Sequence, residues 1–335
     1  KLIDSTLFTE DIFFLVKDNY AELFNYFPNK LKIIRWNYFK YKFNLIYRIK
    51  FLLLVRGFGF KYCYNLTAGR GVTVDELALL SGAEFSFALN TNFRFLRNLY
   101  GKFMNKKYTE IISTEHSSEF EKHLQVLRKL GIHHNSPRTS LYIDDLELIK
   151  AKKILTELDV ENYIVISPFS DLNIKNWNID KYRELVLKIV NQYQAVTILF
   201  IGNTFQKEKI SKSFEVNQRL INLAGSLSII ESTAILNNAL LFIGNDSGFT
   251  HIAKALEIPT IAIIGGGSNG YFFPYGSDDK IVYLYSPQDC FRCEWRCIHK
   301  IAFCLQEVKV DDVFREVRKI IQNDGNEISD NNTNS

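Results

Sequence analysis

The 335-residue chain contains no run of 18–20 uncharged apolar residues, so the sequence predicts no membrane-spanning helix. Residues 43–60 come closest, but Arg48, Lys50 and Arg56 interrupt them. The sequence also shows no secretory signal pattern. We therefore expect a cytoplasmic protein that can touch the inner face of the cytoplasmic membrane as a peripheral protein.

Acidic residues are absent between Lys30 and Arg70, where ten basic residues occur. Such a block suggests an anionic partner, which could be a nucleic acid, a membrane surface or a phosphorylated glycolipid. A solvated basic face is the commoner alternative. Because no nucleic-acid-binding motif accompanies the block, we expect no nucleic acid partner.

The chain is long enough for two domains, and its 47% hydrophobic content supports well-filled cores. Apolar runs typical of buried strands alternate with helical patterns, which predicts α/β domains with parallel sheets. We expect an amino-terminal domain over 1–140, a carboxyl-terminal domain over 141–321 and a disordered tail over 322–335. Residues 89–115 lack a clear period and are predicted to be loop or irregular helix.

Residues 239–264 predict a strand–turn–helix–strand unit. An apolar run, Ala239 to Ile243, precedes the polar turn Asn245-Asp246-Ser247-Gly248, and a helical pattern continues to Pro259. The free N–H groups and the dipole of a helix that starts at this turn favour phosphate. His251 lies one turn into the helix and can face the same ligand. The alternative is an ordinary turn in which Asp246 or Ser247 only caps the helix.

This unit resembles the signature of the family-9 glycosyltransferases, the heptosyltransferases of lipopolysaccharide assembly: G-N-D-[ST]-G-x-x-H-x-A-x-A-L-x-x-P-T. The matching residues are Gly244, Asn245, Asp246, Ser247, Gly248, His251, Ala253, Ala255, Leu256, Pro259 and Thr260. The resemblance covers most of the chain and is strongest from about 160 to 320. It implies a GT-B fold, with two Rossmann-like domains facing each other across a cleft. It also implies inverting transfer of a heptose or similar sugar from an ADP-sugar to a lipopolysaccharide core or related surface glycan.

A second motif, residues 167–185, resembles the strand–loop–K-x-W segment of the same family, with Lys175 and Trp177 in the matching places. In the family this loop and its lysine hold the donor's diphosphate. Ser170 can donate to a phosphate oxygen, and Lys175 can neutralise the leaving group without a divalent metal. Phe169 stands where the family usually has glycine. Outside the motif, Lys175 would be interpreted as an exposed surface charge.

Together the two motifs predict a donor diphosphate and sugar site. Its members are Ser170, Lys175, Asp246, Ser247, Gly248 and His251. Gly265 and Gly266, in the glycine-rich turn 265–276, are weaker candidates for the donor nucleoside because glycines allow close backbone approach to a ligand. Glu208 is a weaker candidate for the donor ribose.

The sequence does not identify a catalytic base. In the family this base is a carboxylate in a G-D turn after the first strand, and residues 12–17 resemble the second strand. Asp4, Glu10 and Asp11 are acidic but out of pattern. We expect the first βα unit to be missing from the sequence or altered. If the base has been lost, the alternative function is a non-catalytic sugar-nucleotide or glycan-binding protein on a degenerate GT-B fold.

Four of the five cysteines cluster as Cys290-x2-Cys293-x3-Cys297-x6-Cys304. In a cytosolic chain such a cluster predicts a structural zinc or iron site with no part in catalysis. Related autotransporter heptosyltransferases use a four-cysteine iron site, which adds to this prediction. His299 could replace one ligand, and free or disulfide-linked thiols are the alternative.

Overall fold

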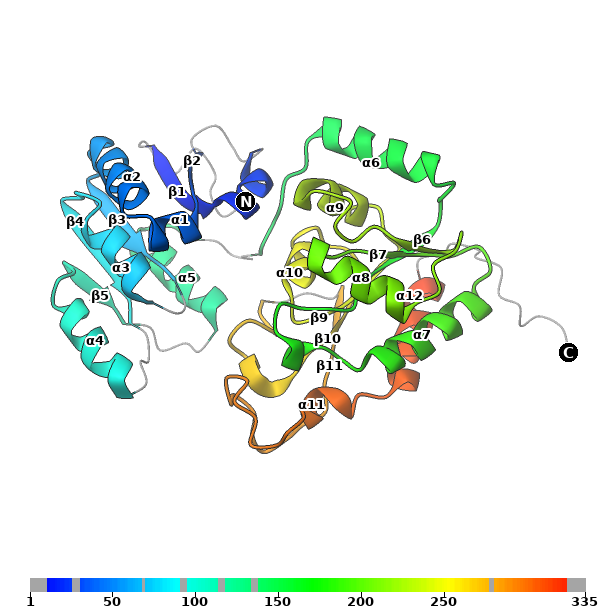
Figure 1. Cartoon of the computed structure of the whole chain (residues 1–335). Helices are drawn as coiled ribbons and strands as arrows, with labels where there is room; N and C mark the ends of the chain where they lie inside the picture. The colour runs from blue at the N-terminus through cyan, green and yellow to red at the C-terminus, as the bar shows by residue number, and fades with distance from the viewer. Residues whose placement is uncertain are drawn as a thin grey trace, which may run out of the picture. The chain divides into compact units, whose positions relative to one another are not determined.

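The computed structural model describes residues 11–25, 31–67, 70–90, 95–113, 118–133, 138–276 and 280–323. The chain divides into two compact units (Figure 1). The described residues from 138 onward, with 22–25, form the carboxyl-terminal unit, and the others form the amino-terminal unit. We describe each unit by itself.

The carboxyl-terminal unit is built on a six-stranded parallel sheet with the order β11-β10-β9-β6-β7-β8. Its strands are β6 (Tyr163–Ser167), β7 (Thr197–Phe200), β8 (Leu220–Asn222), β9 (Leu241–Asn245), β10 (Thr260–Ile263) and β11 (Ile281–Leu284). The chain adds β7 and β8 on one side of β6, then returns to place β9 on the other side. This reversal makes a topological switch point between β6 and β9, where open parallel sheets bind ligands at the carboxyl ends of their strands.

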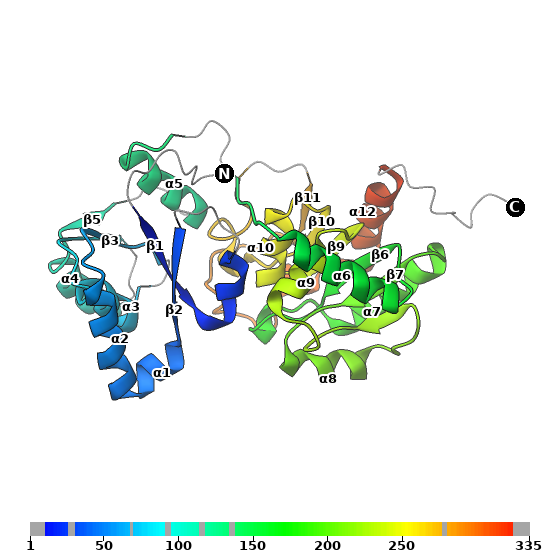
Figure 2. The same ribbon diagram turned by 90° about the horizontal axis from the view of Figure 1, so that it is seen from above.

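Helices cover both faces of this sheet (Figures 1 and 2). On one face, α7 (Ile179–Gln192) and α12 (Val310–Asn323) share a core with Ile164 and Ile243. On the other face, α6 (Asp145–Glu157), α9 (Ile229–Leu236) and α10 (Gly248–Ala255) share a core with Val165 and Phe242. Neighbouring strand residues thus pack on opposite faces. The remaining helices of this unit are α8 (Thr204–Ser213) and α11 (Phe303–Gln306).

In its described residues, the amino-terminal unit contains two parallel sheets. The first pairs β1 (Ile12–Lys17) with β2 (Leu31–Trp36), and the second has the order β3 (Tyr62–Asn65), β4 (Phe85–Leu89), β5 (Glu110–Ile112). Within the described residues, no strand joins β1 to β3. The helices here are α1 (Tyr38–Phe43), α2 (Leu45–Gly57), α3 (Val72–Leu79), α4 (Phe95–Asn105) and α5 (Glu119–Lys129).

One local prediction was wrong: the segment expected to be loop or irregular helix over 89–115 contains α4 and β5. Helix α6 was not predicted. The segment after β1 forms a 3-10 helix, Asp18–Phe24. Helix α9 begins with a capping box, in which both hydrogen bonds between Ser228 and Glu231 are present. Most of the predicted tail, from 324 onward, lies outside the described residues.

Among the residues that the structure describes, no helix is long and apolar enough to cross a membrane.

Candidate functional site

An ion pair between Lys175 and Asp246 lies at the switch point of the six-stranded sheet. Lys175 ends a short 3-10 turn in the loop after β6, and Asp246 directly follows β9. The lysine Nζ lies 2.8 Å from the aspartate Oδ2, and the side chains are only 16% and 7% exposed. An ammonium group carries three N–H donors, so this pairing leaves donors of Lys175 for an anionic ligand.

Two side chains that the sequence did not predict complete the surroundings of this pair. The Ser268 hydroxyl donates to Asp246 Oδ2 at 2.8 Å, and the Trp295 indole N–H donates to Ser268 Oγ at 3.3 Å. The Lys175 ammonium also lies 5.0 Å from the centre of the Trp295 ring, within range of a cation–π interaction. The lysine is therefore held from two sides, by a carboxylate and by an aromatic ring.

Asn245 ties β9 to the loop that carries Lys175. Its side-chain carbonyl accepts a hydrogen bond from the Trp177 backbone N–H at 3.0 Å, and its amide donates to Pro168 O at 2.8 Å. The buried Trp177 donates from its indole to Val308 O at 3.1 Å. Asn245 of one motif and Trp177 of the other therefore both hold the backbone of the loop that carries Lys175.

The start of α10 lies next to this pair. Ser247 is the N-cap residue, but its side chain makes no capping hydrogen bond. Gly248 is exposed, and a Cβ atom placed on it would meet nothing within 4 Å. The first N–H groups of an α-helix have no partner within the helix. The turn therefore presents backbone donors and a positive dipole end beside the Lys175 ammonium.

Aromatic rings pack against His251 of α10. Its imidazole stacks on Phe273 with ring centres 4.1 Å apart, and its Nδ1 lies 3.3 Å from the Tyr275 hydroxyl oxygen. Burial lowers the pKa of His251 to about 4; Asp246 opposes this shift, and Lys175 and Lys254 add to it. The imidazole is therefore neutral at about pH 7 and can exchange hydrogen bonds without adding charge.

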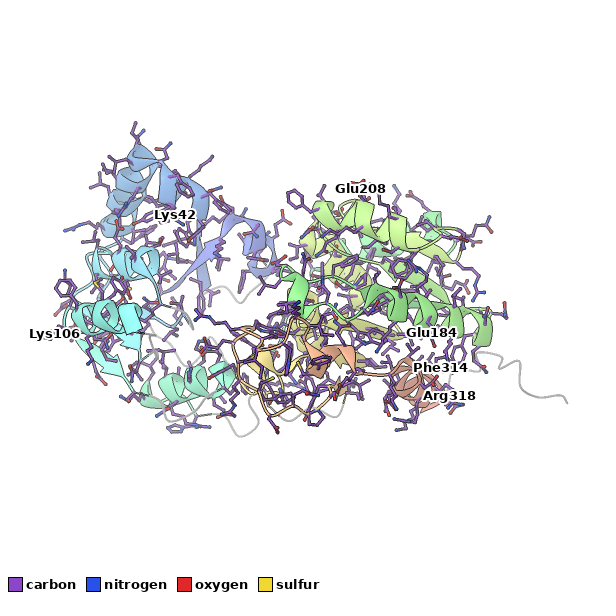
Figure 3. All side chains as sticks on the ribbon, turned by 60° about the horizontal axis from the view of Figure 1, so that its bottom comes forward. Lys42, Lys106, Glu184, Glu208, Phe314 and Arg318 are labelled. Carbon is purple, nitrogen blue, oxygen red and sulfur yellow. The ribbon has the colours of Figure 1, made fainter. Side chains whose placement is uncertain are left out.

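Two other predicted residues have different surroundings. The buried Ser170 hydroxyl donates within its own loop, with Leu172 O at 2.8 Å and Asn176 Oδ1 at 2.9 Å as acceptors. Glu208 lies on the exposed surface of α8 (Figure 3), where it pairs with Lys212 at 2.6 Å. The phosphate contact of Ser170 and the ribose contact of Glu208 remain predictions.

The glycine-rich turn is filled by aromatic side chains from the cysteine-rich segment. A Cβ atom on Gly265 or Gly267 would lie 2.6 or 2.4 Å from the Trp295 ring, and one on Gly266 would lie 2.2 Å from Phe291. All three glycines are buried. They allow close approach by these rings, which is a different use of glycine from the ligand contact predicted for Gly265 and Gly266.

The four clustered cysteines line one pocket, but they do not form a group that could hold a metal ion. In the part of the chain that the structure describes, no group of three or more His, Cys, Asp or Glu residues could hold a metal ion. The thiols are free, and burial, followed by the neighbouring Cys293, raises the pKa of Cys297 to about 11. The described residues therefore do not support the prediction of zinc or iron at Cys290, Cys293, Cys297 and Cys304.

The structure does not identify a catalytic base among Asp4, Glu10 and Asp11. Asp11 is exposed and pairs with Lys32 across β1 and β2. Asp4 and Glu10 lie outside the described residues.

A parallel α/β sheet with helices on both faces makes the carboxyl-terminal unit a Rossmann-like unit, with Lys175 and the start of α10 at its switch point. A family model, glycosyltransferase family 9 (heptosyltransferase), matches residues 95–299. The chain belongs to this family.

Two curated relatives illustrate the match. The chain is 28% identical over 179 residues to lipopolysaccharide heptosyltransferase 3 of Escherichia coli K12, covering 51% of this chain and 50% of the relative. It is 25% identical over 235 residues to lipooligosaccharide heptosyltransferase 2 of Campylobacter jejuni serotype O:6, covering 65% and 72%. The chain thus spans about half the length of the first of these relatives.

Solved structures of the family share the fold. A family-9 glycosyl transferase from Veillonella parvula matches 93% of this chain and 88% of its own with a TM-score of 0.71 at 16% identity. The ADP-heptose lipopolysaccharide heptosyltransferase II of E. coli matches 96% and 93% with a TM-score of 0.69 at 14% identity. The predicted α/β fold of the GT-B class is confirmed.

Proposed function

We propose that this chain is an inverting glycosyltransferase that moves a heptose from an ADP-heptose-like donor to a lipopolysaccharide core or related surface glycan. The observation that carries the proposal is the Lys175 ammonium, held 2.8 Å from Asp246 beside the first turn of α10. Family membership supports the reaction class, and the names of the curated relatives support heptose and lipopolysaccharide.

In the proposed reaction, an acceptor hydroxyl attacks the anomeric carbon while the bond to the nucleoside diphosphate breaks on the opposite face. Negative charge then grows on the leaving diphosphate. Lys175 and the backbone N–H groups at Ser247–Gly248 are already in position when that charge develops, so little reorganisation is needed in the transition state. Asp246 does not touch the reacting atoms in this account. It is a positioning residue that holds the ammonium in place.

The neutral His251 fits the sugar side of the donor. With a pKa of about 4, it can exchange hydrogen bonds with sugar hydroxyls or a phosphate oxygen without competing with Lys175 for the diphosphate's charge. We assign Ser247, Gly248 and His251 to the donor together with Lys175. An acceptor of lipid-linked core would bring the chain to the inner face of the cytoplasmic membrane as a peripheral protein.

The test combines a binding arm and a transfer arm. Calorimetry with ADP and ADP-heptose should give binding to the wild-type chain that Lys175→Ala weakens. Incubation of ADP-heptose with heptose-deficient lipopolysaccharide should then give a product one heptose larger. Binding without transfer to any such acceptor would favour the alternative of a non-catalytic sugar-nucleotide-binding protein. Loss of both arms would overturn the proposal.

A further inference from the structure

Helices α1 and α2 of the amino-terminal unit present apolar side chains outward. The exposed ones form what we call the α1–α2 face: Phe39, Phe43, Leu45, Ile46, Ile49, Leu53 and Leu54. Their exposed fractions run from 50% at Ile49 to 74% at Phe43. Single exposed apolar residues are normal on protein surfaces, but a contiguous group of this kind marks an interaction site.

The orientation of α2 is fixed by contacts on its inner side. Phe51 and Val55 are buried in a core with Trp36, Tyr41 and Leu77. Arg48 forms an ion pair with Glu76 of α3. Because a core and an ion pair hold the inner side of α2, the fold itself turns the opposite side of this helix outward.

The outward side of α2 carries an apolar stripe. Ile46, Ile49 and Leu53 follow the spacing i, i+3 and i+7, which places them on one side of a helix. A surface helix of a globular domain ordinarily turns charged residues to this side. In α2, Lys50 and Arg56 are exposed at the margins of the stripe instead.

The charged side chains that α1 and α2 themselves carry are all of one sign. Lys40 and Lys42 of α1 are exposed, as are Lys50 and Arg56 of α2, and no acidic residue occurs in the sequence from Lys30 to Arg70. The Lys42 ammonium lies 5.2 Å from the centre of the Phe43 ring, so charge and apolar surface are adjacent. The partner of this face must therefore offer apolar material and negative charge together.

We propose that the α1–α2 face docks onto an anionic lipid bilayer. Aliphatic and aromatic side chains flanked by Lys and Arg are what an interfacial helix presents to lipid acyl chains and acidic headgroups. A second copy of the chain suits the face less well. In a two-fold dimer the same patch meets itself, which would set these cations against one another. With 13 residues, α2 is also too short to span a bilayer and suits an orientation along the surface.

The proposal rests on the proposed function only in that a lipid-linked acceptor would give the docking a purpose. The contact itself can be measured without any sugar transfer. Failure of the two proposals is thus distinguishable: the full chain can bind ADP without binding vesicles, or bind vesicles without binding ADP.

The experiment is co-sedimentation of the full chain with phosphatidylcholine vesicles, with and without about a third phosphatidylglycerol. We expect binding mainly to the anionic vesicles, and weaker binding at high salt. The variant Ile46→Ser/Ile49→Ser/Leu53→Ser should lower the partition coefficient by about a hundredfold or more. Lys42→Gln/Lys50→Gln should lower it by about 25-fold, at about fivefold for each charge.

Matched controls come from the carboxyl-terminal unit. Phe205→Ser removes a highly exposed apolar side chain, and Lys152→Gln/Lys300→Gln removes two exposed charges; both should bind vesicles like the wild type. Thermal unfolding and ADP binding of every variant show that the fold is kept. The proposal is overturned if the wild type ignores anionic vesicles, or if the triple serine variant binds them equally well. It is also overturned if sedimentation shows a dimer that this variant dissolves, since the face would then be a self-interface.

Discussion

The Lys175 ammonium lies between the Asp246 carboxylate, at 2.8 Å, and the Trp295 ring, at 5.0 Å. Each of the three residues comes from a different loop, which follows β6, β9 or β11 respectively. The position of the lysine is thus set by tertiary structure before any ligand arrives. Such preorganisation is what a group that meets developing negative charge requires.

A double-mutant cycle should show that Lys175 and Asp246 are strongly coupled. Removing one partner leaves the other charge largely buried and unpaired, so Lys175→Met or Asp246→Ala alone should each cost about 3 kcal/mol of unfolding free energy. The double variant should cost less than the sum, with a coupling of about 1–3 kcal/mol in urea unfolding.

The exposed pair Glu208–Lys212 on α8 is the matched control. It is as close, at 2.6 Å, but its side chains are 77% and 75% exposed. Its coupling should be below about 1 kcal/mol because solvent screens it. Equal coupling energies for the two pairs would contradict our account of burial.

Gly267→Ala should destabilise the carboxyl-terminal unit through a clash with Trp295. The new Cβ would lie 2.4 Å from the indole ring, so one of the two groups must move. We expect a loss of about 1–3 kcal/mol in unfolding free energy. Because the cause is a single contact, Gly267→Ala in a Trp295→Ala background should cost much less than in the wild type. Additive costs would show that Trp295 is not the reason for the glycine.

Gly248→Ala should separate binding from stability. A Cβ at this position meets no atom of the chain within 4 Å, so unfolding free energy should change by less than about 0.5 kcal/mol. A diphosphate seated on the first turn of α10 would approach this backbone closely, and the methyl group should weaken ADP binding about tenfold or more. Isothermal titration alongside urea unfolding provides both numbers. Unchanged ADP affinity would place the diphosphate elsewhere.

The low pKa of His251 should make the fold lose stability on mild acidification. In the unfolded chain this imidazole takes up a proton below about pH 6.5, whereas in the folded chain it does so near pH 4. Between these values the unfolded state binds more protons, so unfolding free energy falls as pH falls. His251→Gln should flatten the pH dependence in this window. Parallel curves for the two proteins would show that other groups cause the loss.

The parts of the site predicted from the sequence are those that depend on local patterns. The unit over 239–264 appears as β9, α10 and β10 because apolar runs, a polar turn and Pro259 mark each boundary locally. Placing Lys175 in one site with Asp246 followed from the resemblance of their two segments to motifs of the family. Neither step required knowledge of side-chain packing.

The parts that were missed depend on contacts between distant segments. Ser268 reaches Asp246, and Trp295 reaches Ser268 and Lys175, only because the glycine-rich turn folds against the cysteine-rich segment, which no periodicity predicts. The four clustered cysteines line one pocket, but their spacing in the sequence does not determine whether the sulfur atoms are arranged to hold a metal ion. Similarly, β5 has three residues, and its pairing with β4 is a backbone contact that the residue pattern does not encode.

The central claim, that Lys175 and the start of α10 form the site for a donor's diphosphate, is tested most directly by calorimetric titration of ADP into two variants. Lys175→Ala should weaken ADP binding about 30- to 150-fold, the equivalent of one lost charge-assisted contact of about 2–3 kcal/mol. Lys152→Ala, which removes an exposed lysine of α6, should bind ADP like the wild type. Equal ADP affinity in Lys175→Ala and the wild type would contradict the account.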